Sequence, residues 1–257
     1  MSTTTANVDY VSTVFQYPVL TKVHDTPTYD LLKRIKDELK ANAGNVQCDL
    51  GGDRHGHLGL VLSPEEYASI SATAYVRPVH PGATYPVGAT NYATQILREN
   101  HQEAIRLYRE ANGVEDALIG QLTQALPPLY LESYRDPHSN RITAPLITIL
   151  ADLFTTYGSI SEEELEEKEQ ALRARVFDIT RPLLHVFSAI ENLQQVALAS
   201  GTPYTVKQRI NIGLYLIKNM GEFEKGLSSW YERPSTDHTW PIFKQHFNDT
   251  YNRLRRL

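Results

Sequence analysis

The chain has 257 residues, of which 41% are hydrophobic and 21% are charged, and its formal net charge is −5. A chain of this size buries one large core or two cores of about 100–150 residues each, and the acidic balance argues against a main body that binds nucleic acid. No apolar run approaches the ~18 residues that span a bilayer, and residues 1–7 lack the basic and apolar regions of a secretory leader. We therefore expect an intracellular, cytoplasmic protein with no membrane partner.

The first 62 residues predict an arm, a helix and a short extended segment. Residues 1–27 form an N-terminal arm that packs on the body or pairs as a short strand. Helical periodicity begins at Thr28 and ends at Gly44. Residues 45–62 combine glycines with a strand-like end, which favours a short hairpin or extended segment.

The next elements complete a predicted N-terminal helical domain over residues 28–134. A short helix is expected over 64–71, followed by a long irregular loop over 72–89. Two helices, 90–112 and 114–126, should follow with Gly113 between them.

Residues 135–141 are polar and rich in turn-forming residues, which predicts an interdomain linker, although a loop inside one larger helical domain is the alternative. A C-terminal helical domain over 142–257 follows. Its first helix should span 142–158, with Thr143 as the cap and Gly158 in the left-handed conformation at its end. Further helices are expected at 161–176, 182–200, 205–220, 221–231 and 239–257. The predicted fold is mainly α, with two helical lobes.

Two groups near the C-terminus are candidate functional residues. The first group is a set of large aromatic residues, Trp230, Trp240, Phe243 and Phe247. We expect them to belong to the core or to an assembly surface. The second group is the basic C-terminal end, Arg253, Arg255 and Arg256. It either contacts RNA or complements a helix dipole.

The best candidate for chemistry is a histidine pair. On an extended strand His55 and His57 point the same way, so they would bind a divalent metal with Asp53 and a distant ligand, either His80 or His101. The alternative is structural: the glycines allow a tight backbone path and the histidines hydrogen-bond to loop groups. Because no second ligand cluster has a recognisable spacing, we expect no tightly bound metal, no cofactor and no catalytic residues.

Cysteine and nucleophile patterns give no further candidate. Cys48 is the only cysteine, so we expect no intrachain disulfide, no cysteine-based zinc site and a reducing compartment. No serine lies in a Gly-x-Ser-x-Gly elbow, and neither common phosphate-loop motif is present.

Several motifs in order resemble one known family. They are the run GGDRHGHLGLVLSPEEY from Gly51 to Tyr67, Arg77-Pro78 with Pro81-Gly82, the helix that ends in Phe-x-x-Tyr-Gly158, the turn Gly201–Thr205, and Trp230 followed by the pattern Trp240-x-x-Phe243-Lys-x-x-Phe247. Over roughly residues 25–250 the chain is similar to the Gag-like proteins of Copia-type LTR retrotransposons, particularly those of diatoms and other algae.

The resemblance implies a capsid-like protein of two helical lobes that self-associates into a shell around retroelement RNA. The zinc knuckle that usually accompanies Gag is missing from this sequence, so the RNA contact would come from the basic C-terminus or from a separate segment. Two alternatives remain: a domesticated, Gag-derived helical adaptor that binds another protein, and a metal-dependent enzyme that uses His55 and His57. We expect a non-enzymatic homo-oligomer.

Overall fold

The computed structural model describes residues 9–52, 54–84, 88 and 90–255, and over these residues it is mainly helical and contains no strand. The chain divides into two compact units, residues 1–158 and 159–257. The helices of the first unit are α1 (Tyr10–Thr13), α2 (Tyr29–Asn45), η1 (Leu58–Leu60), α3 (Pro64–Ala68), α4 (Asn91–Ala125), η2 (Pro128–Tyr134) and α5 (Leu146–Tyr157). Those of the second are α6 (Glu162–Ala174), α7 (Leu184–Ala199), α8 (Val206–Asn219), α9 (Glu224–Tyr231), η3 (Ser235–Asp237) and α10 (Trp240–Leu254). Among the described helices, none has the length and apolar character needed to cross a bilayer.

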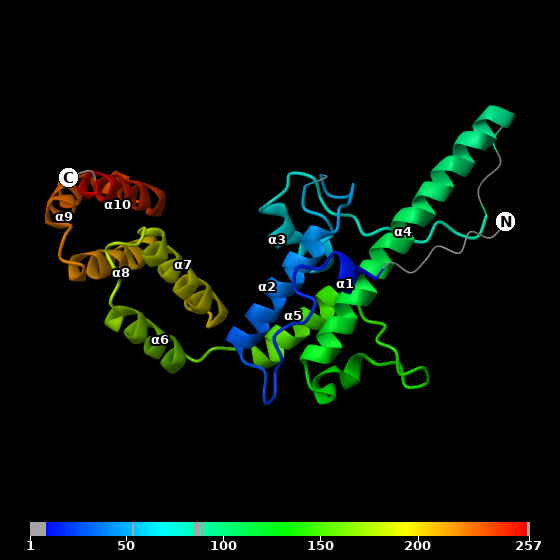
Figure 1. Ribbon diagram of the computed structural model, residues 1–257, viewed down its shortest axis with the longest axis horizontal. Coiled ribbons are helices and arrows are strands. Elements are labelled where there is room, and N and C mark those ends of the chain that lie inside the picture. Colours follow the sequence, from blue (N-terminus) through cyan, green and yellow to red (C-terminus); the bar gives the residue numbers. More distant parts are fainter. Residues whose placement is uncertain (1–8, 53, 85–87, 89, 256–257) are drawn as a thin grey trace. The chain divides into compact units, whose positions relative to one another are not determined.

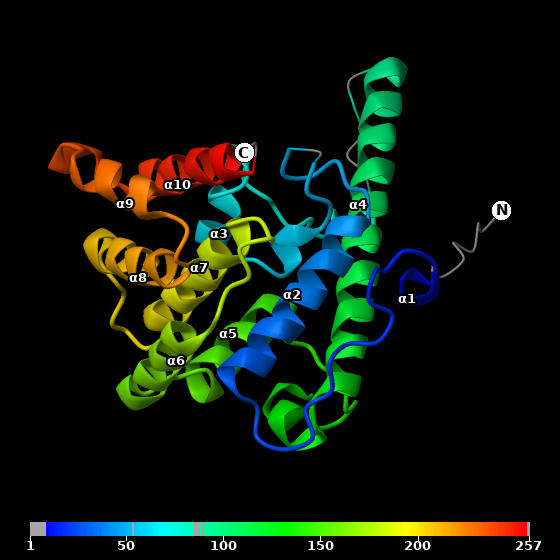
Figure 2. The same ribbon diagram turned by 60° about the vertical axis from the view of Figure 1, so that its left-hand side comes forward.

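The framework of the first unit consists of α2, α4 and α5, which lie side by side in both views (Figures 1 and 2). The side chain of Thr28 accepts a hydrogen bond from the Leu31 amide and so caps α2. One face of α2 then buries Leu32, Ile35 and Leu39 at helical spacing. These side chains join a single apolar cluster with residues of α4 and α5.

Helix α4 runs for 35 residues without a break, which corrects the predicted separation at Gly113. A glycine inside a helix costs only about 1 kcal/mol relative to alanine. The buried residues Ala111, Val114 and Leu118 lie on both sides of Gly113 and anchor one continuous helix against the core. The burial of these neighbours outweighs the helix-breaking tendency of one glycine.

Two polar side chains on the buried face of α2 hold the N-terminal segment in place. Asn42 pairs with the backbone of Tyr17 through Oδ1 and Nδ2, at 2.7 and 2.8 Å. Glu38 accepts from the amide and hydroxyl of Thr21, both at 2.7 Å. Gln121 of α4 donates to the carbonyl oxygens of Tyr17 and Pro18. The described part of the predicted arm is therefore bound along α2 and α4, and Tyr10–Thr13 forms a helical turn.

The predicted linker at 135–141 lies inside the first unit, which corrects the predicted domain boundary. Asp136 Oδ1 accepts hydrogen bonds from the amides of His138 and Ser139, and an antiparallel bridge joins Arg135 to Ile142. These residues form a closed turn that returns the chain to the core. The buried residues of α5 in this core are Leu146, Ile149, Leu150 and Leu153, and the partly buried Phe154 and Tyr157 pack against it.

The ends of α5 also differ from the sequence-based expectation. Pro145, and not Thr143, is the residue that precedes the first turn. Gly158 ends the helix at φ −95°, outside the left-handed region. A Cβ atom there would lie 2.6 Å from the Phe154 carbonyl oxygen, so the position requires glycine for space and not for a positive φ.

A buried carboxylate on α4 caps α5. Glu115 Oε1 accepts from the Leu146 amide at 2.9 Å, and Oε2 pairs with Arg77 from the irregular segment after α3. One side chain thus joins three parts of the first unit. A helix-terminal N–H in a buried position needs such a partner.

We expect Glu115→Ala to lower the free energy of unfolding by about 1–3 kcal/mol, because the Leu146 N–H becomes a buried donor without a partner. Denaturant unfolding followed by circular dichroism measures this loss. Asp116→Ala, at the exposed neighbouring position, is the control and should change stability by less than about 0.5 kcal/mol. Equal stability of the two variants would contradict the capping role.

The second unit packs its helices around aromatic rings. Buried rings come from α7, from both ends of α9 and from α10, and they include Phe187, Phe223, Trp230, Trp240, Phe243 and Phe247. Gly213 of α8 and Gly226 of α9 let these helices approach α10, since a Cβ atom would lie 2.7 Å from the Phe243 ring or 2.8 Å from Thr250 Cγ2. The aromatic residues of the C-terminal pattern therefore belong to a core.

Candidate functional site

Over its described residues, the glycine-rich segment after α2 folds as turns and the 3-10 helix η1, not as the predicted hairpin or extended segment. Gly56 has φ +52°, and a Cβ atom there would lie 2.4–2.8 Å from the carbonyl oxygens of Ala43, Gly44 and Val46. The next amide, of His57, donates to the Ala43 carbonyl oxygen at 2.9 Å. The chain therefore turns back against the end of α2 and directs His57 into the interior.

Two tyrosines close over this turn. Tyr67 of α3 donates its hydroxyl to the Gly51 carbonyl oxygen at 3.0 Å. Tyr75 lies so close to Gly59 that a Cβ atom at that position would be 2.1 Å from the tyrosine ring. The rings of Tyr67 and Tyr75 are 5.8 Å apart. Glycine at positions 51 and 59 thus makes room for Tyr67, which contacts the His55 ring, and for Tyr75, which contacts the His57 ring.

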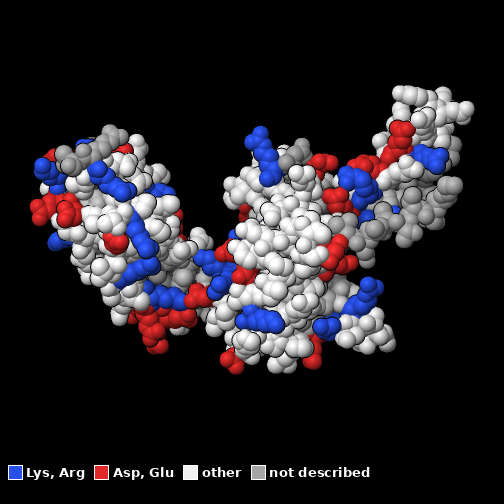
Figure 3. Space-filling model, in the orientation of Figure 1, with Lys and Arg blue, Asp and Glu red and all other residues white. Residues whose placement is uncertain are grey.

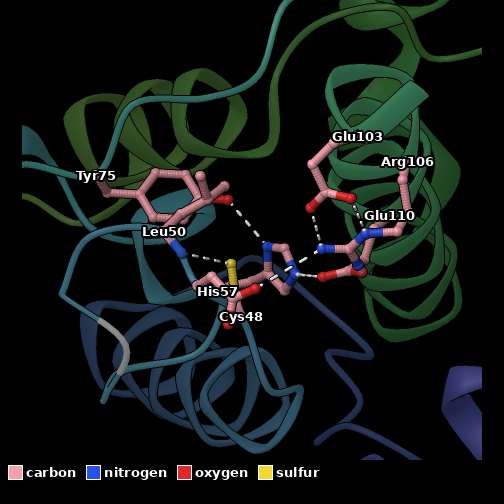
Figure 4. Close-up of polar contacts among 8 residues, drawn as sticks. Cys48, Leu50, His57, Tyr75, Glu103, Arg106 and Glu110 are labelled. Carbon is pink, nitrogen blue, oxygen red and sulfur yellow. Dashed lines mark hydrogen bonds and ion pairs between the residues drawn. The ribbon is translucent and has the colours of Figure 1, made fainter. Parts of the chain in front are cut away.

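His57 is fully buried and both of its ring nitrogens have partners (Figure 4). Nδ1 lies 2.9 Å from the Tyr75 hydroxyl, and Nε2 lies 3.2 Å from Glu110 Oε1 on α4. Burial lowers the pKa of His57, and the hydrogen bond and charge of Glu110 oppose that effect. For a neutral ring, Nε2–H donates to the carboxylate and the Tyr75 hydroxyl donates to Nδ1.

Cys48 is the third member of this group. Its Sγ, an imidazole nitrogen of His57 and a carboxylate oxygen of Glu110 all lie within 4.8 Å of one another. The Leu50 amide donates to Sγ at 3.3 Å. Burial raises the pKa of the Cys48 thiol, while the Leu50 hydrogen bond lowers it. We call Cys48, His57 and Glu110 the CHE cluster.

Arg106 binds acidic side chains beside the CHE cluster, including Glu110 of the cluster itself (Figure 4). Its Nη1 donates to Glu110 Oε2 at 2.7 Å, and its Nε and Nη2 bind both oxygens of Glu103. Asp49 Oδ2 lies 3.7 Å from Arg106 Nη2. Glu110 is therefore fixed from one side by the arginine and presents its other oxygen to His57.

The predicted histidine pair does not converge. The His55 ring packs edge-on against Tyr67, whereas His57 turns into the CHE cluster, so the expectation that both point the same way is corrected. His80 Nδ1 accepts from the Gly82 amide, and its ring contacts Tyr108. His101 is not part of the CHE cluster. Asp53 lies outside the described residues.

The basic C-terminus is partly described. Arg253 and Arg255 are exposed on the last turns of the chain, and the Arg255 guanidinium lies 5.6 Å from the centre of the Tyr251 ring. Arg253 also lines a surface cavity of about 370 Å³ with Glu222 and Glu224. Arg256 lies outside the described residues.

Cys48 and Glu110 were not predicted to be neighbours of His57. Their separations of 9 and 53 residues from His57 match no ligand motif, and Glu110 lies on a helix with many other acids. The expectation of no cysteine-based zinc site was based on motifs that contain several cysteines. The spacing of neighbouring residues in the sequence does not indicate that Glu110, 53 residues after His57, packs against it in the fold.

Comparison of the chain with family models, with curated proteins and with solved structures gave no match. The resemblance to Copia-type Gag proteins therefore rests on the sequence motifs.

Proposed function

We propose that this protein is a non-catalytic, Gag-like structural protein that self-associates through weak contacts repeated between copies, as a capsid-like shell around RNA requires. The observation that carries the proposal is that each of the two helical units exposes large apolar side chains. Tyr92 on α4 is 74% exposed, and Tyr231 on α9 is 65% exposed. Tyrosine is enriched at protein interfaces and among residues that dominate binding.

A surface on each unit allows a chain to contact two neighbours at once. Contacts between different surfaces of identical chains produce rings, shells or filaments, depending on the rotation between copies. Further exposed apolar residues lie on both units, among them Val79 in the first and Val176 and Leu184 in the second. This distribution supports association in more than one direction.

The charge distribution also supports association. In Figure 3 a broad area of the first unit carries no Lys, Arg, Asp or Glu, and charged residues lie at its edges. On the second unit the acidic residues of α6 gather at one edge. With a net charge of −5, repulsion between copies is modest, and added salt screens it within about 10 Å at 0.1 M.

RNA is the proposed cargo, and the support for it comes from the resemblance and from the exposed Arg253 and Arg255. Phosphate contacts require clustered cations that release counterions. The small basic group at the C-terminus fits an accessory RNA contact better than a complete RNA-binding surface.

We expect association to increase with protein concentration and with salt, and the double variant Tyr92→Asp/Tyr231→Asp to weaken it at least about tenfold, or ~1.4 kcal/mol. The cause is that a charge placed in an apolar contact must lose its hydration. Sedimentation velocity over a concentration series, with electron microscopy in the presence and absence of single-stranded RNA, measures the change.

The matched control is Asn91→Asp/Ser228→Asp, which adds the same charge at exposed positions on the same two helices. It should associate like the wild type. A wild-type chain that stays monomeric at high concentration and high salt, with and without RNA, would refute the proposal and favour a helical adaptor. Equal weakening by both double variants would show that charge alone, and not the tyrosine contacts, controls association.

A further inference from the structure

We propose that the CHE cluster, formed by Cys48, His57 and Glu110, binds one divalent transition-metal ion of the zinc class and that this ion fastens the segment after α2 to α4. The proposal goes beyond self-association, and it replaces the expectation that the chain holds no tightly bound metal. It also replaces the ligand set Asp53, His55 and His57 that the sequence suggested.

The spacing of the donor atoms is close to that of a zinc site. Zinc bonds of about 2.3 Å to sulfur and about 2.0 Å to nitrogen or oxygen place tetrahedral ligands about 3.2–3.6 Å apart. His57 Nε2 and Glu110 Oε1 are already 3.2 Å apart, and all three donor atoms lie within 4.8 Å. On metal binding, Cys48 Sγ must come closer to the other two donor atoms than the present limit of 4.8 Å.

The donor set also has the right chemistry. A thiolate, a neutral imidazole and a carboxylate are all established zinc ligands. Together they carry a charge of −2, which balances the charge of the ion. On binding, the Cys48 thiol gives up its proton to solvent, and the Nε2 proton of His57 is exchanged for one on Nδ1, so that Nε2 faces the metal. The fourth position is left for water.

Each ligand has a second partner that orients it, as is usual in metal sites. The Tyr75 hydroxyl contacts His57 Nδ1, and after the tautomer changes it can accept a hydrogen bond from Nδ1–H. Arg106 holds the other oxygen of Glu110, and the Leu50 amide donates to Cys48 Sγ, which stabilises a thiolate.

The ion would link two segments that are far apart in the sequence, the turn after α2 and helix α4. Cys48 and His57 belong to the turn after α2, and Glu110 belongs to α4. Ligands that are brought together only by folding bind the metal in the native state alone, so binding stabilises that state by mass action. We therefore assign the ion a structural role in the first unit.

The test uses the 257-residue chain without a tag, kept reduced and titrated with Co²⁺ as a spectroscopic substitute for Zn²⁺. Because Cys48 is the only cysteine, a thiolate-to-cobalt charge-transfer band reports this residue alone. We expect one equivalent of Co²⁺, visible d–d bands of a four-coordinate ion, loss of both signals when Zn²⁺ is added, and a higher thermal midpoint with either metal.

Three variants and one control separate metal binding from packing. Cys48→Ser should abolish the charge-transfer band, Glu110→Gln should weaken binding strongly, and Tyr75→Phe, which keeps the ring over Gly59, should weaken it about 10–100-fold. His55→Gln should bind like the wild type. Far-UV circular dichroism checks that each variant is folded.

Absence of a charge-transfer band in folded wild-type protein would overturn the proposal. So would stoichiometric binding that survives Cys48→Ser, or binding that is lost in His55→Gln. Because self-association is measured without added metal and by sedimentation, its failure and the failure of this site are distinguishable.

Discussion

Trp230→Ala should lower the free energy of unfolding of the second unit by about 3–5 kcal/mol, the usual cost of truncating a buried tryptophan. Trp230 is 1% exposed, and its ring lies 5.2 Å from Phe243 and 4.9 Å from His238. Removal of the indole leaves a cavity at the centre of the aromatic cluster, and helices already in close contact at Gly213 and Gly226 cannot collapse into it without moving α10.

The measurement is chemical denaturation followed by tryptophan fluorescence. Both tryptophans lie in the second unit, so the remaining Trp240 reports its unfolding. Lys225→Ala, at an exposed position of the same helix α9, should change stability by less than about 0.5 kcal/mol. A loss below about 1 kcal/mol for Trp230→Ala would contradict the central packing role of this ring.

Stability and association of a Trp240→Ala variant together distinguish a core position from an assembly surface. The Trp240 ring stacks on Phe243, and its Nε1 donates to Glu191 at 3.0 Å. These contacts are internal to the second unit, so stability should fall when the ring is removed. Loss of association by Trp240→Ala at unchanged stability would instead place this ring in a contact between copies.

Gly56→Ala should destabilise the first unit by about 2–5 kcal/mol. About 1–2 kcal/mol comes from forcing a residue with a side chain into the left-handed region, and about 1–3 kcal/mol comes from overpacking. The atoms that a Cβ would meet are backbone carbonyl oxygens of α2 and of the residue after it, which cannot rotate away as a side chain would. The turn itself must shift, and His57 shifts with it.

Gly120→Ala is the matched control for this substitution. Gly120 lies inside α4, and a Cβ atom there would have no neighbour within 4 Å. The added methyl group should stabilise the helix by about 0.5–1 kcal/mol. The two changes have identical chemistry and opposite expected signs, and circular dichroism during urea unfolding measures both. A neutral Gly56→Ala would contradict the tight path of the backbone at this turn.

Several features of the fold follow from the sequence alone, and the structure confirms the mainly helical class. Caps and apolar spacing are local properties, and they placed α2, α8 and α10 within a few residues of their observed bounds. The spacing of Trp240, Phe243 and Phe247 likewise predicted a shared helical face, and all three rings are buried. Such features depend on residues within one or two turns of each other, which the sequence lists directly.

Other features were decided only by tertiary contacts. Gly113 was predicted to separate two helices, but burial of the residues on both sides of it against the core makes α4 continuous. Residues 135–141 read as a linker, but Asp136 closes them into a turn, and Glu115 holds the start of α5 in the first unit. The division of the chain between residues 158 and 159 depends on which core α5 joins.

The CHE cluster shows the same limit at the level of the site. His57 was predicted as a candidate ligand because it lies in a histidine- and glycine-rich run. Its predicted partners were His55 and Asp53, on the assumption that the run forms an extended strand. Gly56 adopts a left-handed turn where an extended strand was expected, which sends the two histidines to different surroundings. Local composition therefore identified one ligand-type residue, whereas the partners Cys48 and Glu110 were determined by the packing of the turn against α4, an interaction between residues far apart in the chain.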